Sequence, residues 1–185
     1  GNSDIFYEAG FKTSLEAPAW LKSIGLSAYE ISFGRGYRMK SEMANLIGLE
    51  SEKNDILISL HAPYFINFAN ESDEMIEKSM GYVLTGLKML RLIKGKNLVV
   101  HVGSQGSLPR EKAIELISKR LDILVKVVYE NGYDDMCICL ETMGKKGQIG
   151  SYEEIIDLCT KDKIFVPAFD FGHIYSFNLG NFGSY

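Results

Sequence analysis

Two patterns of apolar positions alternate along the chain. Short, nearly continuous apolar runs are typical of strands buried in a parallel sheet, whereas longer segments with an apolar residue every three or four positions predict helices. The expected strands are Ala28–Phe33, Ile56–Leu60, Leu98–Val100, Met136–Leu140 and Ile164–Phe169. The expected helices are Ser14–Ile24, Lys40–Glu50, Asp73–Ile93, Pro109–Asn131 and Tyr152–Cys159. Strands and helices that alternate in this way predict an α/β fold with a parallel sheet covered by helices.

Polar residues with metal-binding chemistry stand at the ends of these runs. His61, His101, Glu141 and Asp170 each follow an apolar run directly, in steps of 40, 40 and 29 residues, and His173 follows Asp170 closely. None of the three histidines falls inside a predicted helix. A (β/α) barrel uses about 31 residues for each unit and more where loops are inserted, and its active site lies where the strands end. The spacing therefore predicts a TIM (β/α)8-type barrel in which these five side chains converge.

The converging side chains predict a metal centre. A single histidine or carboxylate at a strand end is more often a structural hydrogen-bonding or helix-capping residue than a ligand. That interpretation would have to hold independently for all five residues, so the metal site is the better hypothesis. Imidazole and carboxylate together suit zinc, and also iron or manganese. A carboxylate shared by two ions would also suit phosphoester hydrolysis.

Composition narrows the class of protein. Hydrophobic residues make up 46% of the chain and charged residues 24%, and no apolar run approaches the ~20 residues of a membrane span. No signal peptide is recognisable, and three cysteines without a CxxC pair argue against a disulfide framework. We therefore expect a cytoplasmic protein with no membrane partner. The net charge of −4 argues against a simple DNA-coating protein, although cations at an acidic site could still meet phosphate.

Four motifs resemble one known family. LHAPYFIN, VVHVGS, CLET and FDFGH occur in this order between residues 60 and 173, and they resemble endonuclease IV, the apurinic/apyrimidinic endonuclease family of base-excision repair. That family shares a xylose isomerase-like TIM barrel. The resemblance implies a hydrolase that binds up to three Zn²⁺ ions and cleaves double-stranded DNA 5′ to abasic sites.

The resemblance also implies roles for individual residues. His61 and His101 would bind the first zinc, and Glu141, the catalytic carboxylate, would bridge the first and second ions. Asp170 would also hold the second ion and His173 the third. Mn²⁺ or Fe²⁺ could replace zinc at such ligands.

The family's DNA-contacting positions can be matched as well. Tyr64 matches a family position whose ring enters the DNA at the lesion, although a tyrosine packed beside the metal site is an equal alternative. Arg35 and Arg38 could contact phosphate, although exposed arginines are common without such a role. We expect a monomer that binds double-stranded DNA with abasic sites.

The chain departs from the family in its number of strands. Five strands are predicted where the barrel has eight, so residues 1–185 are expected to form a single partial TIM-barrel domain that lacks the first strand and the last two. The segment 1–10 and the tail Tyr175–Tyr185 are expected to be loops. The family's remaining metal ligands would belong to the missing strands. We therefore expect a fragment with little nuclease activity on its own.

Two other functions remain open. A sugar isomerase or epimerase of the same barrel superfamily also places glutamate, aspartate and histidine around a divalent ion. A non-catalytic relative that binds metal or DNA without turnover is the third hypothesis.

Overall fold

The computed structural model describes residues 2–180 and contains a five-stranded, entirely parallel sheet in the order β1-β2-β3-β4-β5. The strands are β1 (Ala28–Ser32), β2 (Leu57–His61), β3 (Asn97–Val100), β4 (Cys137–Glu141) and β5 (Phe165–Ala168). Strands that are consecutive in the chain are neighbours in the sheet, and a helix connects each to the next. This is the connectivity of a (β/α) barrel wall, so the predicted fold class is confirmed.

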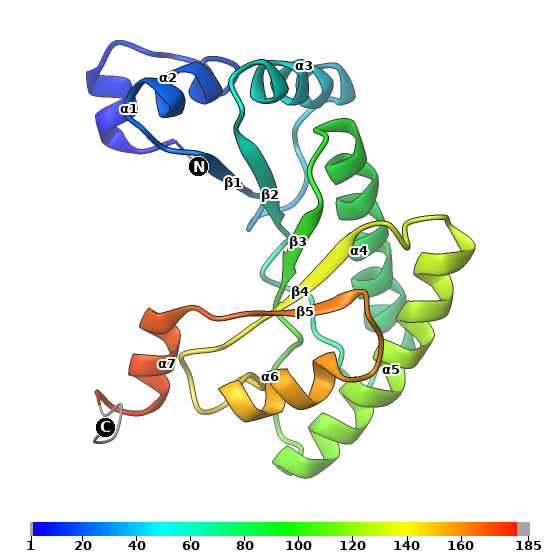
Figure 1. Ribbon diagram of the computed structural model, residues 1–185. Coiled ribbons are helices and arrows are strands. Elements are labelled where there is room, and N and C mark those ends of the chain that lie inside the picture. The colour runs from blue at the N-terminus through cyan, green and yellow to red at the C-terminus, as the bar shows by residue number, and fades with distance from the viewer. Residues whose placement is uncertain (1, 181–185) are drawn as a thin grey trace.

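The helices precede and connect the strands. They are α1 (Asp4–Glu8), α2 (Ala17–Ser23), α3 (Ser41–Lys53), α4 (Asp73–Leu92), α5 (Arg110–Glu130), α6 (Tyr152–Cys159) and α7 (Phe171–Phe177). Figure 1 shows α4 and α5 along one side of the sheet, while α7 lies beyond the end of β5. The helices that connect the strands pack on one face of the sheet, and the five strands correspond to part of the wall of an eight-stranded barrel.

The two faces of the sheet have different chemistry. In β1, Tyr29 and Ile31 are buried toward the helices, whereas Glu30 and Ser32 alternate onto the open face. In the central strands Leu60 and Leu98 are completely buried. Burial of such side chains between sheet and helices stabilises the fold by roughly 1.5–3 kcal/mol each. In β1 the alternation sends Glu30 and Ser32 into the space that a barrel encloses.

Helix α3 approaches the end of the following helix closely at a glycine. A Cβ added at Gly48 would lie 2.8 Å from the backbone of Ile93, which follows α4 directly. Any side chain at this position would push the two helices apart, so Gly48 is required for the helices to pack at this distance.

Several element boundaries differ from the sequence prediction. Strand ends shift by at most one residue, and helix ends shift by up to three residues. Two segments that were expected to be loops contain helix instead. Segment 1–10, expected to be a loop, contains α1, whose Phe6 is completely buried. The tail expected to begin as a loop at Tyr175 continues α7 as far as Phe177, and residues 181–185 lie outside the described part of the chain.

The cysteines behave as packing residues. Cys139 is buried and Cys137 and Cys159 are half-buried, and all three are free thiols. Burial raises the pKa of Cys139 to about 12, so this thiol stays protonated at neutral pH. None of the described helices combines the length and the apolar character that crossing a membrane requires.

Candidate metal centre

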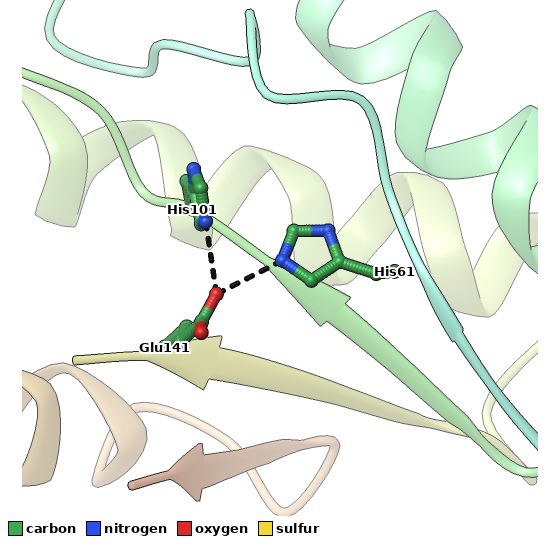
Figure 2. A group of neighbouring side chains, drawn as sticks. All are labelled: His61, His101 and Glu141. Carbon is green, nitrogen blue, oxygen red and sulfur yellow. Dashed lines mark hydrogen bonds and ion pairs between the residues drawn. The ribbon is translucent and has the colours of Figure 1, made fainter. Parts of the chain in front are cut away.

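Strand ends bring His61, His101 and Glu141 together. His61 is the last residue of β2, Glu141 is the last residue of β4, and His101 follows β3 directly. Because all strands are parallel, their carboxyl ends meet at one edge of the sheet. Figure 2 shows both imidazole rings directed at the Glu141 carboxylate.

The spacing of these three side chains fits a metal ion. Oε2 of Glu141 lies 3.0 Å from Nε2 of His61 and 2.9 Å from Nε2 of His101. Two ligand atoms on a tetrahedral zinc lie roughly 3.3 Å apart, given Zn–N and Zn–O bonds of ~2.0–2.1 Å. The candidate ligand atoms are therefore already about as close as a shared ion requires, and all three side chains are largely buried.

A second group forms around the other oxygen of the same carboxylate. Nδ1 of His173 lies 3.6 Å from Oε1 of Glu141 and 3.8 Å from Oδ2 of Asp170. Ligand atoms of Glu141, Asp170 and His173 lie within 4.8 Å of one another, so this group could also hold a metal ion. Each oxygen of Glu141 thus faces a different group of candidate ligands.

The local structure around Asp170 corrects one expectation. His173 was expected outside any helix, but it lies in the first turn of α7. Asp170 is the N-cap of this helix, and its Oδ1 accepts a hydrogen bond of 2.8 Å from the backbone N–H of His173. The cap leaves Oδ2 of Asp170 facing the imidazole, so the helix start fixes the spacing of this pair.

Backbone carbonyls orient two of the imidazoles. Nδ1 of His61 lies 2.8 Å from the carbonyl oxygen of Ala62, and Nδ1 of His173 lies 2.9 Å from that of Thr142. A hydrogen bond of this kind fixes the tautomer and the ring orientation of a metal-ligating histidine. It leaves Nε2 of His61 to face Glu141. In His173 the nitrogen nearest Glu141 and Asp170 is this same Nδ1, which can bind an ion only when it carries no proton.

Electrostatics keep Glu141 ionised. Burial by itself raises the pKa of Glu141, but hydrogen bonds from His101 and His61 outweigh it and hold this pKa at about 2. Burial by itself lowers the pKa of His61, but its hydrogen bonds to Glu141 and Ala62 raise this pKa above its ordinary value. Without an ion, the raised pKa of His61 favours a proton on this imidazole, which compensates the charge of the buried carboxylate.

Tyr64 covers the histidines. Its ring is stacked on His101, with centroids 5.3 Å apart and planes at 15°, and meets the edge of His61 at 5.0 Å. Its hydroxyl lies 3.1 Å from Oγ of Ser32. The ring is thus folded over the candidate metal centre with 55% of the residue surface exposed. A role for Tyr64 in DNA binding stays a prediction.

The candidate ligands share one cavity of about 570 Å³. Its lining adds Glu30, Tyr64, Met143, Gly144, Lys145, Gln148 and Ser176 to the five candidate ligands. Arg35 and Arg38 are not brought to this cavity, and both lie on the loop after β1.

Sequence reasoning missed Glu30 and Lys145 of this lining. Glu30 could have been found, because its place between Ala28 and Ser32 in an alternating strand predicts an inward carboxylate. Lys145 carried no signal, because it lies on an irregular loop. That loop is held by Arg110, whose guanidinium donates to the carbonyls of Lys146 and Gln148 at 2.7 and 3.1 Å.

Relatives match the sequence over much of its length. The chain is 31% identical over 185 residues to an uncharacterized protein of Methanocaldococcus jannaschii, covering 98% of this chain and 66% of that protein. It is 32% identical over 134 residues to a probable endonuclease 4 of Methanosphaera stadtmanae, covering 69% of this chain and 46% of that protein. The chain therefore spans about two thirds or less of the length of these relatives.

Solved structures share the fold. Endonuclease IV from Thermus thermophilus superposes with a TM-score of 0.66 at 22% identity, covering 88% of this chain and 60% of that one. D-psicose 3-epimerase from Clostridium cellulolyticum, solved with D-tagatose, superposes with a TM-score of 0.70 at 12% identity, covering 89% and 60%. The family profile described as xylose isomerase-like TIM barrel matches residues 18–183. The chain belongs to the xylose isomerase-like TIM barrel family.

Proposed function

We propose that this chain belongs to a metal-dependent phosphodiesterase that cleaves DNA 5′ to abasic sites, as endonuclease IV does. One observation carries the proposal: the two oxygens of Glu141 face two different ligand groups, His61 with His101 on one side and His173 with Asp170 on the other. A carboxylate placed in this way suits a pair of ions, and paired ions are typical of phosphodiester hydrolysis.

The residues present fit zinc, with Mn²⁺ or Fe²⁺ as alternatives. His61, His101 and Glu141 would hold one ion, and Glu141 with Asp170 and His173 would hold another. When bound, such ions supply an activated water and neutralise the charge that develops on the phosphate. Glu141 is the proposed catalytic residue because it is shared by both groups. Residues of the family's longer proteins would complete a third site.

Other side chains suit a DNA substrate. Lys145 lines the cavity and can pair with a phosphate beside the ions. Arg35 and Arg38 extend the cationic surface on the loop after β1, where they can contact the DNA backbone. Tyr64 also lines this cavity, and in this proposal its ring would contact an extruded nucleotide. The protein is proposed to act as a cytoplasmic monomer on double-stranded DNA.

The comparisons support the proposal through the names of related proteins. The relative in Methanosphaera stadtmanae is named a probable endonuclease 4. Because this chain covers 46% of that protein, the activity of the whole protein belongs to the proposal.

The decisive experiment combines metal content with cleavage. The natural full-length protein would be purified without chelator, analysed for zinc, iron and manganese, and incubated with a duplex that contains one abasic-site analogue. We expect incision 5′ to the lesion, loss of incision with chelator, and recovery when zinc is returned. Glu141→Gln should abolish incision and reduce bound metal. Glu115→Gln, which alters an exposed carboxylate on α5, is the matched control.

Two results would contradict the proposal. Protein that holds no metal would remove its chemical basis. Protein that holds metal and binds the duplex without cutting it would indicate the non-catalytic alternative.

Sugar isomerisation or epimerisation is the second candidate, and Glu30 favours it. This carboxylate lines the cavity and accepts a hydrogen bond of 3.2 Å from Oγ of Ser59. A carboxylate readily accepts hydrogen bonds from sugar hydroxyls and repels phosphate. Exchange of a carbon-bound proton of a ketose for deuterium in D₂O, followed by NMR, would support this candidate.

A further inference from the structure

One of the three imidazoles at the candidate metal centre is held differently from the others. His61 and His173 each have Nδ1 within 2.9 Å of a backbone carbonyl. Across residues 2–180 no such partner is found for Nδ1 of His101. The ring of Tyr64 instead lies nearly parallel to the His101 imidazole, at 15° and 5.3 Å between centroids. His101 therefore has an aromatic stack on its ring face, whereas the other two imidazoles have a hydrogen bond at Nδ1.

Residues of a neighbouring strand and loop surround the stacked ring. The hydroxyl of Tyr64 lies 3.1 Å from Oγ of Ser32, the last residue of β1. A Cβ added at Gly34 would lie 2.2 Å from the Tyr64 ring, so the absence of a side chain at Gly34 makes room for the ring. The backbone of Gly34 is outside the left-handed region, so conformation alone does not require glycine there. Glycine is needed there because the Tyr64 ring occupies the space that a side chain would take.

We propose that Tyr64 is a positioning residue for His101. This inference rests on the proposed role of His101 as a metal ligand. The tyrosine ring covers one face of the imidazole and limits its rotation, which keeps Nε2 directed at Oε2 of Glu141, 2.9 Å away. Groups that orient a metal-ligating histidine typically change metal affinity by roughly 10–100-fold when removed. Tyr64 thus sets zinc affinity through His101 without touching the ion.

The structure offers two independent ways to remove the stack. Tyr64→Leu deletes the aromatic ring. Gly34→Ala leaves the tyrosine intact but places a methyl group where its ring lies, and the exposed ring can move away. Tyr64→Phe keeps the ring and loses only the hydroxyl contact with Ser32. The matched control is Gly81→Ala, because nothing lies within 4 Å of a Cβ added at Gly81.

The measurement is the zinc dissociation constant of the natural full-length protein, by competition with a chromophoric chelator. We expect roughly tenfold weaker binding in Tyr64→Leu and in Gly34→Ala. Tyr64→Phe and Gly81→Ala should bind like wild type. Urea unfolding in chelator should show that the variants remain folded. Histidine-selective NMR of the metal-free protein should show a change at His101 in the two weakened variants.

The outcomes separate this inference from the proposed function. Zinc bound by wild type and equally tightly by Tyr64→Leu and Gly34→Ala would overturn the positioning role alone. Weaker binding in Tyr64→Phe equal to that in Tyr64→Leu would also overturn it, because the hydroxyl rather than the stack would then matter. A wild-type protein that binds no zinc would overturn the proposed function and the inference with it.

Discussion

At the residue scale, the unusual feature is a buried carboxylate between two largely buried imidazoles. Glu141 is 8% exposed and His61 is 7% exposed, so an unpaired charge on either would be costly. In the metal-free protein these groups compensate each other, because the carboxylate is ionised and His61 gains affinity for a proton. The same negative oxygen that attracts protons would attract a cation, so metal ions and protons compete for this centre.

This competition predicts how the stability of the metal-free protein depends on pH. The folded-state pKa of Glu141, about 2, is below its unfolded value, so its contribution is present above about pH 4.5 and lost as pH falls toward 2. The folded-state pKa of His61 is raised, so its contribution is present below about pH 6.5 and lost as pH rises through that raised pKa. Glu141→Gln should therefore be most destabilising between about pH 4.5 and 6.5.

Urea unfolding in chelator at about pH 3.5, 5.5 and 9 would test this prediction, because these values lie on either side of and within the expected window. Glu77→Gln is the control, because Glu77 is an exposed carboxylate on α4 that belongs to neither ligand group. A stability difference between wild type and Glu141→Gln that does not change with pH would contradict it.

At the element scale, helix α6 begins at a capping box joined to an ion pair. Ser151 and Glu154 form the reciprocal cap, and Glu154 also pairs with the Arg110 guanidinium, Nε to Oε1 at 2.6 Å. Arg110 in turn holds the loop that carries Lys145 and Gln148 into the cavity. One glutamate therefore connects a helix start to the cavity lining.

Glu154→Gln should destabilise the protein by about 1–2 kcal/mol near neutral pH, since it removes charge-assisted hydrogen bonds to Arg110 and to the backbone. Burial by itself raises the pKa of Glu154, but these hydrogen bonds outweigh it and lower the pKa. The contribution is thus present above the unfolded pKa of about 4.5 and is lost as pH falls through the lower folded pKa. The difference in urea midpoint between wild type and Glu154→Gln should be smaller at about pH 3 than at about pH 7.

Asp157→Asn is the matched control for Glu154→Gln, because Asp157 is an exposed carboxylate on the same helix. An equal loss of stability in both variants would show that the capping pair is not the cause.

At the scale of the whole molecule, the candidate ligands come from four consecutive segments of the sheet. His61 ends β2, His101 follows β3, Glu141 ends β4, and Asp170 with His173 follows β5. Ions held by these ligands would connect strands that are up to 112 residues apart in the chain, counting from His61 to His173. Binding that occurs only in the folded state stabilises that state by mass action.

Zinc should therefore raise the unfolding temperature, by an amount equivalent to about 2.7 kcal/mol when free zinc is about 100 times its dissociation constant. Differential scanning fluorimetry with zinc and with chelator would measure the shift. Glu141→Gln should show little or no shift. A shift of the same size in that variant would mean that zinc binds elsewhere.

The sequence by itself determined the strand and helix order and the place of the candidate ligands. Apolar runs that end in His61, His101 and Glu141 are local signals, because a parallel strand presents its last residue at the sheet edge whatever the details of packing. Helices α1 and α7 were missed because they are short, and short helices depend on tertiary contacts such as the burial of Phe6.

Only the tertiary structure decided how these residues face one another. The two oxygens of Glu141 divide between two groups, Tyr64 folds onto His101 rather than outward, and Arg35 and Arg38 stay off the cavity. These arrangements depend on sheet register, on the space left at Gly34 and on side-chain rotamers. Long-range packing fixes all three, and no pattern along the chain records it.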